Sequence, residues 1–444
     1  MNFPILTMLV LLPVAGSLLT AIISNRQPDL VKVTALLTSA ATGGMSIWLL
    51  FAFKKGDAGF QFVSEHAWIR AWGISWHLGV DGISLFLVVL TGLLFPLVIA
   101  GIDPHHDHKR YLSWMLLLQA GVMGSFVSLD LFLFFVFFEI VLVPMYFLIG
   151  NWGYDQRVYA ATKFFIYTMA GSAFMLVGLV ATAFLARRDI GHLSFDLIEI
   201  AEKSDFAIGT GRWLFVGFVI AFAVKVPLFP LHTWLPDVHV EAPTGGSVVL
   251  AAIMLKLGGY GFLRLSLPIV PDASQYLSGF MIFLSLVAVV YIGLVALVQT
   301  DMKKLIAYSS ISHMGFVTLG IFIFSEQGMQ GAILQMVNHG LITGALFLSV
   351  GIIYERTHDR TIAKMGGLAG RVPVWAVAFG FFTMASVGLP GLAGFVGEFL
   401  VFLGTFAVSP IAAGIAALVM VFGAVYLLCF VGLGYVAHLS ERSE

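Results

Sequence analysis

The chain has 444 residues, of which 59% are hydrophobic and 11% are charged, and its net charge is −1. A soluble domain is about 45–50% apolar and about 25% charged, so this composition predicts an integral membrane protein. The balanced charge argues against nucleic acid as a partner. The single cysteine, Cys429, excludes an intrachain disulfide and a cysteine-rich iron–sulfur or zinc site.

Apolar stretches of about 20 residues predict an all-α integral membrane protein with about thirteen transmembrane helices. The predicted spans are 5–24, 30–53, 82–101, 110–128, 130–150, 159–186, 212–230, 245–266, 277–298, 303–324, 328–354, 374–405 and 409–437. The predicted loops on the side opposite the N-terminus contain more lysine and arginine than the loops on the N-terminal side. Arg264 is one of the basic residues assigned to the N-terminal side. By the positive-inside rule, the N-terminus is therefore expected outside.

Two of these spans contain helix breakers. The first has the sequence KVPLFPLHTWLP at 225–236, and the second has GLPGLAGFVGE at 388–398. Proline removes a backbone donor and clashes with the preceding turn, so each span should break into two half-helices. Broken helices in matching places indicate two inverted five-helix repeats with the functional site at the breaks. The predicted parts are a three-helix segment (1–109), a first repeat of spans 4–8 (110–270) and a second repeat of spans 9–13 (271–444).

Four charged side chains lie deep inside the apolar stretches: Glu139, Lys225, Lys256 and Glu398. A charge at the bilayer centre costs roughly 2.5–3.5 kcal/mol, so membrane proteins keep such residues mainly in ion pathways or in pairs. Proton or ion transfer is therefore the predicted function.

A pairing of Glu139 with Lys225 could work as a switch. Burial lowers the pKa of a lysine, whereas a carboxylate within about 4–6 Å raises it, so separating the two charges would release the proton. The alternative is a static ion pair that fixes helix register. Lys256 is a second buried base, and its alternative is a side chain that reaches out to the membrane surface.

Three histidines could connect these groups. His313 and His339 lie inside spans, and His232 follows the first break. Histidine transfers protons near neutral pH, so together with Lys256 these residues could link Lys225 to Glu398. The alternative is that each histidine is only a hydrogen-bonded packing residue.

Polar residues near the span ends suggest structural roles. Asp81 and Asp130 are expected to cap the N-termini of the third and fifth spans. The cluster of His105, His106 and His108 could bind a metal, but a solvated loop is the favoured interpretation.

Several sequence blocks resemble the antiporter-like membrane subunits of respiratory complex I. These blocks are GVDGISLF, FVFFEIVLVPMYFLIGNWG, FAVKVPLFPLHTWLPDVHVEAPTGGSVVLAAIMLKLGGYG, AYSSISHMGF and LPGLAGFVGEF. The resemblance implies that Glu139, Lys225, Lys256 and Glu398 are proton-transfer residues of a bacterial inner-membrane subunit. A glutamate at position 398 is similar to the chain M branch (mitochondrial chain 4 type), because sibling chains and antiporters typically have lysine there.

The resemblance also sets expectations about partners. It implies no redox cofactor on this chain, with FMN, iron–sulfur clusters and quinone in partner subunits, and contacts with neighbouring antiporter-like membrane subunits. Family members usually carry a fourteenth helix. This sequence ends with HLSERSE soon after the thirteenth predicted span, so we expect that the fourteenth helix is missing. The alternatives are a cation/proton antiporter subunit, a subunit of a membrane-bound hydrogenase or photosynthetic complex, and a scaffold subunit.

Overall fold

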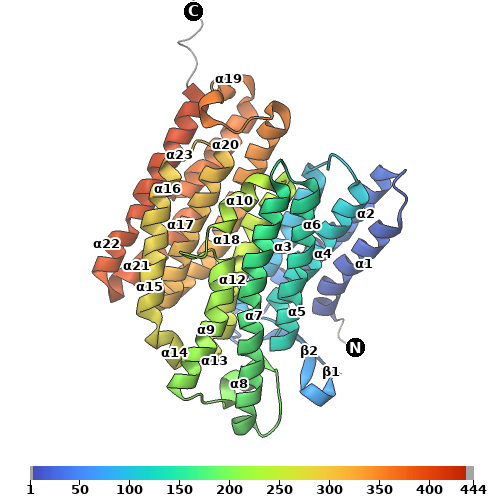
Figure 1. Cartoon of the computed structure of the whole chain (residues 1–444), viewed down its shortest axis with the longest axis vertical. Coiled ribbons are helices and arrows are strands. Elements are labelled where there is room, and N and C mark those ends of the chain that lie inside the picture. Colours follow the sequence, from blue (N-terminus) through green and yellow to red (C-terminus); the bar gives the residue numbers. More distant parts are fainter. Residues whose placement is uncertain (1–3, 437–444) are drawn as a thin grey trace, which may run out of the picture. The chain divides into compact units, whose positions relative to one another are not determined.

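The computed structural model describes residues 4–436, and these are mostly helical, as predicted (Figure 1). The chain divides into two compact units. Unit 1 contains the residues up to Lys225 together with Glu241–Val249 and Lys256–Leu277, and unit 2 contains Val226–Val240, Leu250–Leu255 and the residues from Ser278 onward. The predicted three-part division and the inverted repeats stay predictions. The HLSERSE segment, on which the expected lack of a fourteenth helix depends, lies outside the described residues.

The elements from the start of the chain to the end of the first half-helix belong to unit 1. They are α1 (Ile5–Ile22), α2 (Pro28–Ala52), β1 (Gln61–Ile69), η1 (Arg70–Trp72), β2 (Ile74–Val80), α3 (Gly82–Gly101), α4 (His108–Val127), α5 (Leu131–Ile140), α6 (Leu142–Trp152), α7 (Arg157–Ile190), α8 (Leu197–Lys203) and α9 (Ile208–Lys225).

The following segments alternate between the two units before unit 2 continues. They are α10 (Trp234–Glu241), α11 (Thr244–Val249), η2 (Leu250–Met254), α12 (Leu255–Gly261), η3 (Phe262–Ser266), α13 (Leu267–Ile269), α14 (Pro271–Tyr276), α15 (Ser278–Val287), η4 (Ala288–Ile292), α16 (Gly293–Leu297), α17 (Met302–Phe322), α18 (Glu326–Thr357), η5 (Ile362–Lys364), α19 (Leu368–Arg371), α20 (Pro373–Val387), α21 (Ala393–Val408), α22 (Pro410–Ala416) and α23 (Leu418–Val436). The elements η2, η3 and η4 are π-helical, whereas η1 and η5 are short 3₁₀ turns.

In unit 1, α1 packs on α4 and α2 packs on α3. Small residues allow a close approach between α2 and α3, since a Cβ on Gly43 would lie 2.4 Å from the carbonyl oxygen of Gly92. A second pair is formed by α7 and α9, which bear Ser172 and Lys225. The second pair therefore places Lys225 at the end of a packed helix.

A β-hairpin follows α2 and was not predicted from the sequence. Its strands β1 and β2 are antiparallel, and Gly73 between them has a φ of +65°. The backbone N–H of Leu129 donates to the carbonyl of His77 over 2.9 Å, and that of Leu131 donates to Phe195 over 2.8 Å. The hairpin, the segment before α8 and the start of α5 therefore form one connected network.

In unit 2, the long helix α18 packs on α17 and α21. Both predicted helix breaks are confirmed. The first half-helix α9 ends at Lys225 and α10 begins at Trp234, while α20 ends at Val387 and α21 begins at Ala393.

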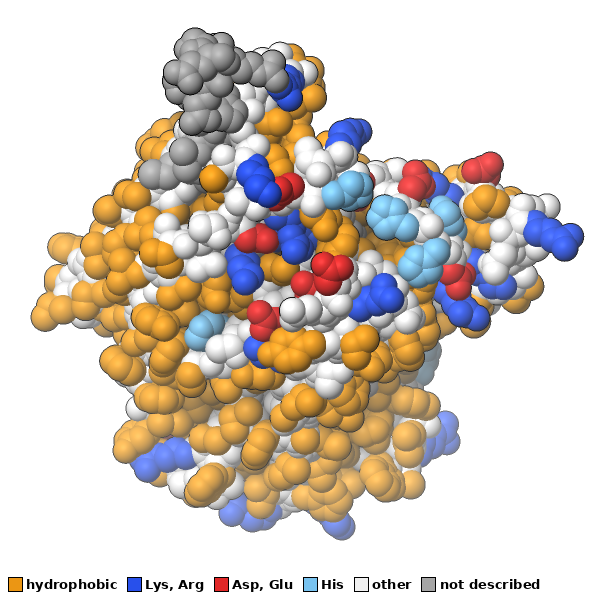
Figure 2. Space-filling model, turned by 45° about the horizontal axis from the view of Figure 1, so that its top comes forward, with side chains coloured by type: hydrophobic (Ala, Val, Ile, Leu, Met, Phe, Trp, Pro, Cys, Tyr) orange, Lys and Arg blue, Asp and Glu red, His pale blue; other side chains and the backbone are white. Residues whose placement is uncertain are grey.

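Eleven of the described helical stretches are long and apolar enough to cross a membrane. The other two predicted spans correspond to α4 and to the broken pair α20 and α21, so the count of thirteen stays a prediction. Large apolar side chains are exposed along the helices, for example Phe51, Trp213 and Val374 at 80–83%. Hydrophobic side chains cover much of the face drawn in Figure 2. Such a surface fits a lipid environment.

Candidate buried proton sites

Lys225 is the last residue of α9, directly before the first break. Its side chain is buried, and its Nζ atom lies 4.8 Å from the ring centroid of Phe138 and 5.7 Å from that of Phe164. The C-terminal end of a helix carries partial negative charge, and ring faces attract cations, so both features stabilise the ammonium group. Among the described residues, no carboxylate forms an ion pair with Lys225 within 4.0 Å.

Glu139 lies at the end of α5, where a turn at Val141 separates this helix from α6. Pro144 has no N–H to donate to the carbonyl of Ile140, so the helical ladder is interrupted beside Glu139. The Glu139 carboxylate faces the Ser172 hydroxyl and interacts electrostatically with Lys225. The two charges are thus near one another without the direct ion pair that was considered from the sequence.

Lys256 is fully buried in the short helix α12. Two π-helical segments, η2 and η3, flank this helix on either side. A π-turn widens the helix and changes the direction in which the next side chains point, and such turns are frequent at functional sites. Local irregularity at Lys256 was not predicted, because a single π-turn has no hydrophobic period of its own.

Glu398 is buried on α21, one turn after the second break. Its Oε1 atom lies 3.0 Å from Nδ1 of His313, and the side-chain amide of Gln335 donates to the same oxygen over 3.0 Å. A Cβ on Gly388 would lie 2.6 Å from Glu398 Oε2, and Gly388 itself has a φ of +79°. The break therefore both turns the chain and leaves room for the carboxylate.

His339 continues the polar group around His313. Its ring centroid is 5.9 Å from that of His313, and its Nδ1 atom is 3.3 Å from Thr343 Oγ1. On α18, Gln335 precedes His339 by four residues, so both side chains lie on one helix face. Gln335 was not predicted as a site residue, although this spacing could have identified it.

His232 lies in the turn between the half-helices α9 and α10. It is buried, and its ring stacks on Phe229 with centroids 5.7 Å apart. The predicted site residues therefore form two sets. Glu139, Lys225 and Lys256 belong to unit 1, and His232, His313, His339 and Glu398 belong to unit 2.

Charged side chains other than the four predicted deep inside the apolar stretches are also buried within the protein. Arg264, whose predicted assignment to the N-terminal side of the membrane stays a prediction, is buried in η3 and forms an ion pair with Asp81 at 2.5 Å. Asp81 also caps α3, and Asp130 caps α5, as predicted. The His106 ring stacks on Trp152 at 5.6 Å, and the histidine cluster at 105–108 forms no metal-binding group among the described residues.

The chain matches the family described as NADH:quinone oxidoreductase/Mrp antiporter, transmembrane region, over residues 128–425. NADH-quinone oxidoreductase subunit M of Rhodobacter capsulatus is 48% identical over 435 residues, covering 96% of this chain and 85% of that protein. NADH-ubiquinone oxidoreductase chain 4 of Marchantia polymorpha is 42% identical over 423 residues, with coverages of 95% and 84%.

Solved structures give the same picture of the fold. A chain of respiratory complex I from Thermus thermophilus with bound NADH is similar with a TM-score of 0.87 and 31% identity, covering 97% of this chain and 88% of that one. A chain of the Mrp complex from Dietzia sp. DQ12-45-1b has a TM-score of 0.84 and 24% identity, with coverages of 96% and 47%. At that identity the second likeness concerns the fold alone.

Proposed function

Because this chain belongs to the NADH:quinone oxidoreductase/Mrp antiporter transmembrane family, we propose that its buried charges form the proton route of a complex I membrane subunit. The protein is a multi-pass membrane subunit of NADH:quinone oxidoreductase and associates with other membrane subunits. Its reaction is proton translocation coupled to quinone reduction elsewhere in the complex. The N-terminus is assigned to the outside in this proposal.

The proposed route begins at Lys225, whose proton occupancy depends on the distance to Glu139. It continues through Lys256, His313 and His339, and it ends at Glu398 as the exit group. His232 lies at the first break, where backbone carbonyls freed from the helix can hold water. Electron transfer is assigned to partner subunits with flavin mononucleotide, iron–sulfur clusters and quinone, because this chain has a single cysteine.

The observation that carries the proposal is the state of Lys225. It is a buried amine at a helix break, with aromatic rings around it and no ion pair within 4.0 Å among the described residues. A buried charge without a direct counterion is costly, so a purely structural role would favour an apolar residue there. This arrangement suits a proton carrier that responds to motion, because a small change in the distance to Glu139 alters the affinity for the proton.

The experiment is Lys225→Ala in the complete complex, reconstituted in liposomes. We expect the protons moved per electron through this subunit to be lost, because alanine cannot carry a proton. Lys364→Ala is the matched control, since Lys364 is exposed and pairs with Asp359 at 2.7 Å. Full pumping by Lys225→Ala would refute the route. Sodium-dependent proton movement without an electron donor would instead support an antiporter.

A further inference from the structure

Three ligand-type side chains meet at one edge of the β-hairpin in unit 1. Glu65 on β1 and His77 on β2 are direct cross-strand partners, so their side chains lie on the same face of the hairpin. Asp196, just before α8, forms a hydrogen-bonded ion pair with the Nδ1 atom of His77. One donor atom from each of the three residues lies within 4.8 Å of the other two.

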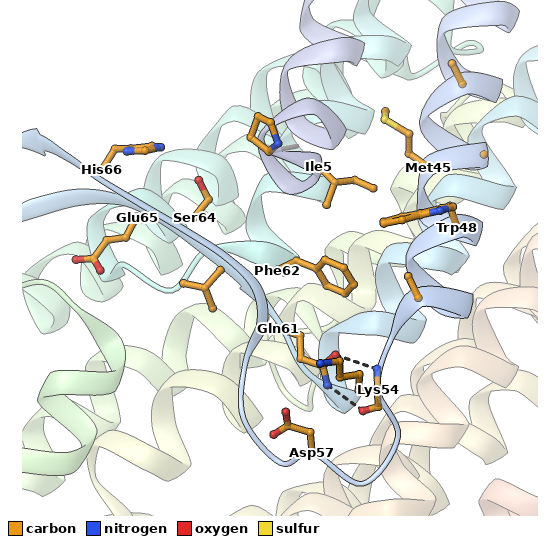
Figure 3. A pocket seen from close by; sticks show the side chains of 15 residues that line it. Ile5, Met45, Trp48, Lys54, Asp57, Gln61, Phe62, Ser64, Glu65 and His66 are labelled. Carbon is orange, nitrogen blue, oxygen red and sulfur yellow. Dashed lines mark hydrogen bonds between the residues drawn. The ribbon is translucent and has the colours of Figure 1, made fainter. Parts of the chain in front are cut away.

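Burial differs among the three residues in a way that suits a binding site. His77 is buried, Asp196 is half-buried, and Glu65 is exposed. Glu65 lines the pocket around these three residues and also the neighbouring pocket that contains Ile5 and Trp48, and Figure 3 shows its carboxylate on the side of the strand opposite those two residues. His77 and Asp196 are therefore held near one another by burial and by their hydrogen bond, and the exposed Glu65 side chain can rotate towards a bound ion.

The surrounding pocket is rich in acids. It has a volume of about 590 Å³, and its charged lining residues are four acids and two bases: Glu65, Asp196, Glu199, Glu202, Arg70 and Lys203. Glu199 is engaged by Lys203 at 2.9 Å and by His192 at 3.3 Å. In the described part of the chain, no lysine or arginine forms an ion pair within 4.0 Å of Glu65 or Asp196. The imidazole of His77 is thus close to two carboxylates, those of Glu65 and Asp196.

We propose that Glu65, His77 and Asp196 bind one Zn²⁺ ion or a similar divalent transition cation. One imidazole nitrogen and two carboxylate oxygens are common zinc donors, and three protein ligands with a water in the fourth position complete a tetrahedron. Zinc–ligand distances of about 2.0–2.2 Å need donors roughly 3.5 Å apart. Binding therefore needs a rotation of the exposed Glu65 side chain. It also releases the proton that His77 Nδ1 shares with Asp196, and the two side chains move apart so that each contacts the ion.

The bound ion would reinforce the network at the start of α5. Asp196 forms a β-bridge with Asp130, which caps the helix that carries Glu139. The ion would therefore clamp the hairpin to the segment before α8 and to the base of this helix. The site is separate from the proposed proton route, so its test does not depend on that proposal.

Zinc binding to the purified, chelator-treated complex tests this site directly. Equilibrium dialysis against Zn²⁺ gives the number of ions and their affinities for the unmodified complex and for Glu65→Gln. We expect the variant to bind one of these ions at least about tenfold more weakly, because it lacks one anionic ligand. Glu202→Gln is the matched control, since Glu202 lines the same pocket outside the three-residue group.

A second variant guards against a nonspecific loss of charge. Glu65→His replaces the carboxylate with another zinc ligand, so it should keep the ion and add a nitrogen ligand to the zinc X-ray absorption spectrum. Equal affinities for the unmodified complex and Glu65→Gln would overturn the proposal. An equal loss in Glu202→Gln, or a failure of Glu65→His to keep the ion, would also overturn it, because either result indicates diffuse attraction to an acidic pocket.

Discussion

The two broken helices place their charged residues in different surroundings. At the first break, Lys225 is enclosed by the rings of Phe138 and Phe164 and has no ion pair within 4.0 Å among the described residues. At the second break, Glu398 lies 3.0 Å from both His313 and Gln335. The Lys225 ammonium interacts with aromatic rings and, at longer range, with the Glu139 carboxylate. The Glu398 carboxylate is in direct contact with polar side chains.

This difference suggests different tasks. An amine that responds to a distant charge changes its proton affinity when that distance changes, so it suits coupling to motion. A carboxylate within hydrogen-bond distance of an imidazole suits direct proton transfer, which needs heavy atoms about 2.6–3.2 Å apart. Within the proposed proton route, we therefore assign control to the first break and proton transfer to the second.

The largest expected effect comes from removing the transfer group. Glu398→Gln keeps the size of the side chain, but an amide neither releases nor accepts a proton at neutral pH. We expect NADH-driven proton pumping through this subunit to fall about tenfold or more, within the range of general acid–base effects. The measurement is the proton-to-electron ratio of the complex in liposomes.

Glu326→Gln is the control for this variant. Glu326 lies at the N-terminus of α18, which packs on the helix of Glu398, and it accepts a hydrogen bond from Gln330 at the surface. This variant should pump normally. Normal pumping by Glu398→Gln as well would remove the distinction between the two breaks.

A smaller effect is expected from the glycines of the second break. Gly388→Ala would impose a φ of +79° on a residue with a Cβ, which costs about 1–2 kcal/mol, and would also place that Cβ 2.6 Å from Glu398 Oε2. Gly391 has a φ of +95°, but a Cβ there would meet nothing within 4 Å. Both variants should lower the thermal stability, measured in detergent.

Only Gly388→Ala should also reduce pumping several-fold, because only its Cβ displaces the carboxylate. Gly391→Ala thus serves as the control for backbone strain alone. Equal pumping by the two variants would indicate that the position of Glu398 is not critical, and the second break would then not differ from the first in the way described above.

The sequence predicted the broken helices and the helix caps because their causes are local. The prolines at 227, 230 and 390 remove backbone donors whatever surrounds them, and Asp81 and Asp130 cap the helices that follow directly. The fold class followed from composition and from the length of the apolar stretches. These features depend on residues that are close together in the chain.

The pairings of the candidate sites could not be predicted in the same way. His313 and Glu398 lie on α17 and α21, and their contact depends on how the helices of unit 2 pack. The ion pair of Arg264 with Asp81 was not predicted, because the two residues lie 183 positions apart in the chain. The hairpin at 61–80 was not predicted, because it lies between the spans and has no long apolar stretch.

The smallest expected effect concerns Asp130, which caps the helix of Glu139. Burial raises the pKa of this carboxyl from 3.8 to about 6, although backbone N–H groups and Ser75 donate to it. His77 and Asp196 are the neighbouring titratable groups. An acid whose pKa is higher in the folded state binds more protons there, so it loses stability as the pH rises towards and through that value.

Between pH 5 and pH 7 the folded state gives up the proton of Asp130, while the unfolded state is already ionised. The loss is about 1 kcal/mol, since one pKa unit corresponds to about 1.36 kcal/mol. The Asp130→Asn variant keeps a capping oxygen but cannot titrate at this position, so the unmodified protein should lose stability relative to the variant over that range. Thermal unfolding of both proteins at the two pH values measures this difference. If the stability difference between the unmodified protein and the variant is the same at both pH values, the Asp130 carboxylate is already ionised at pH 5. The start of α5 would then not respond to protons in the way proposed for the two breaks.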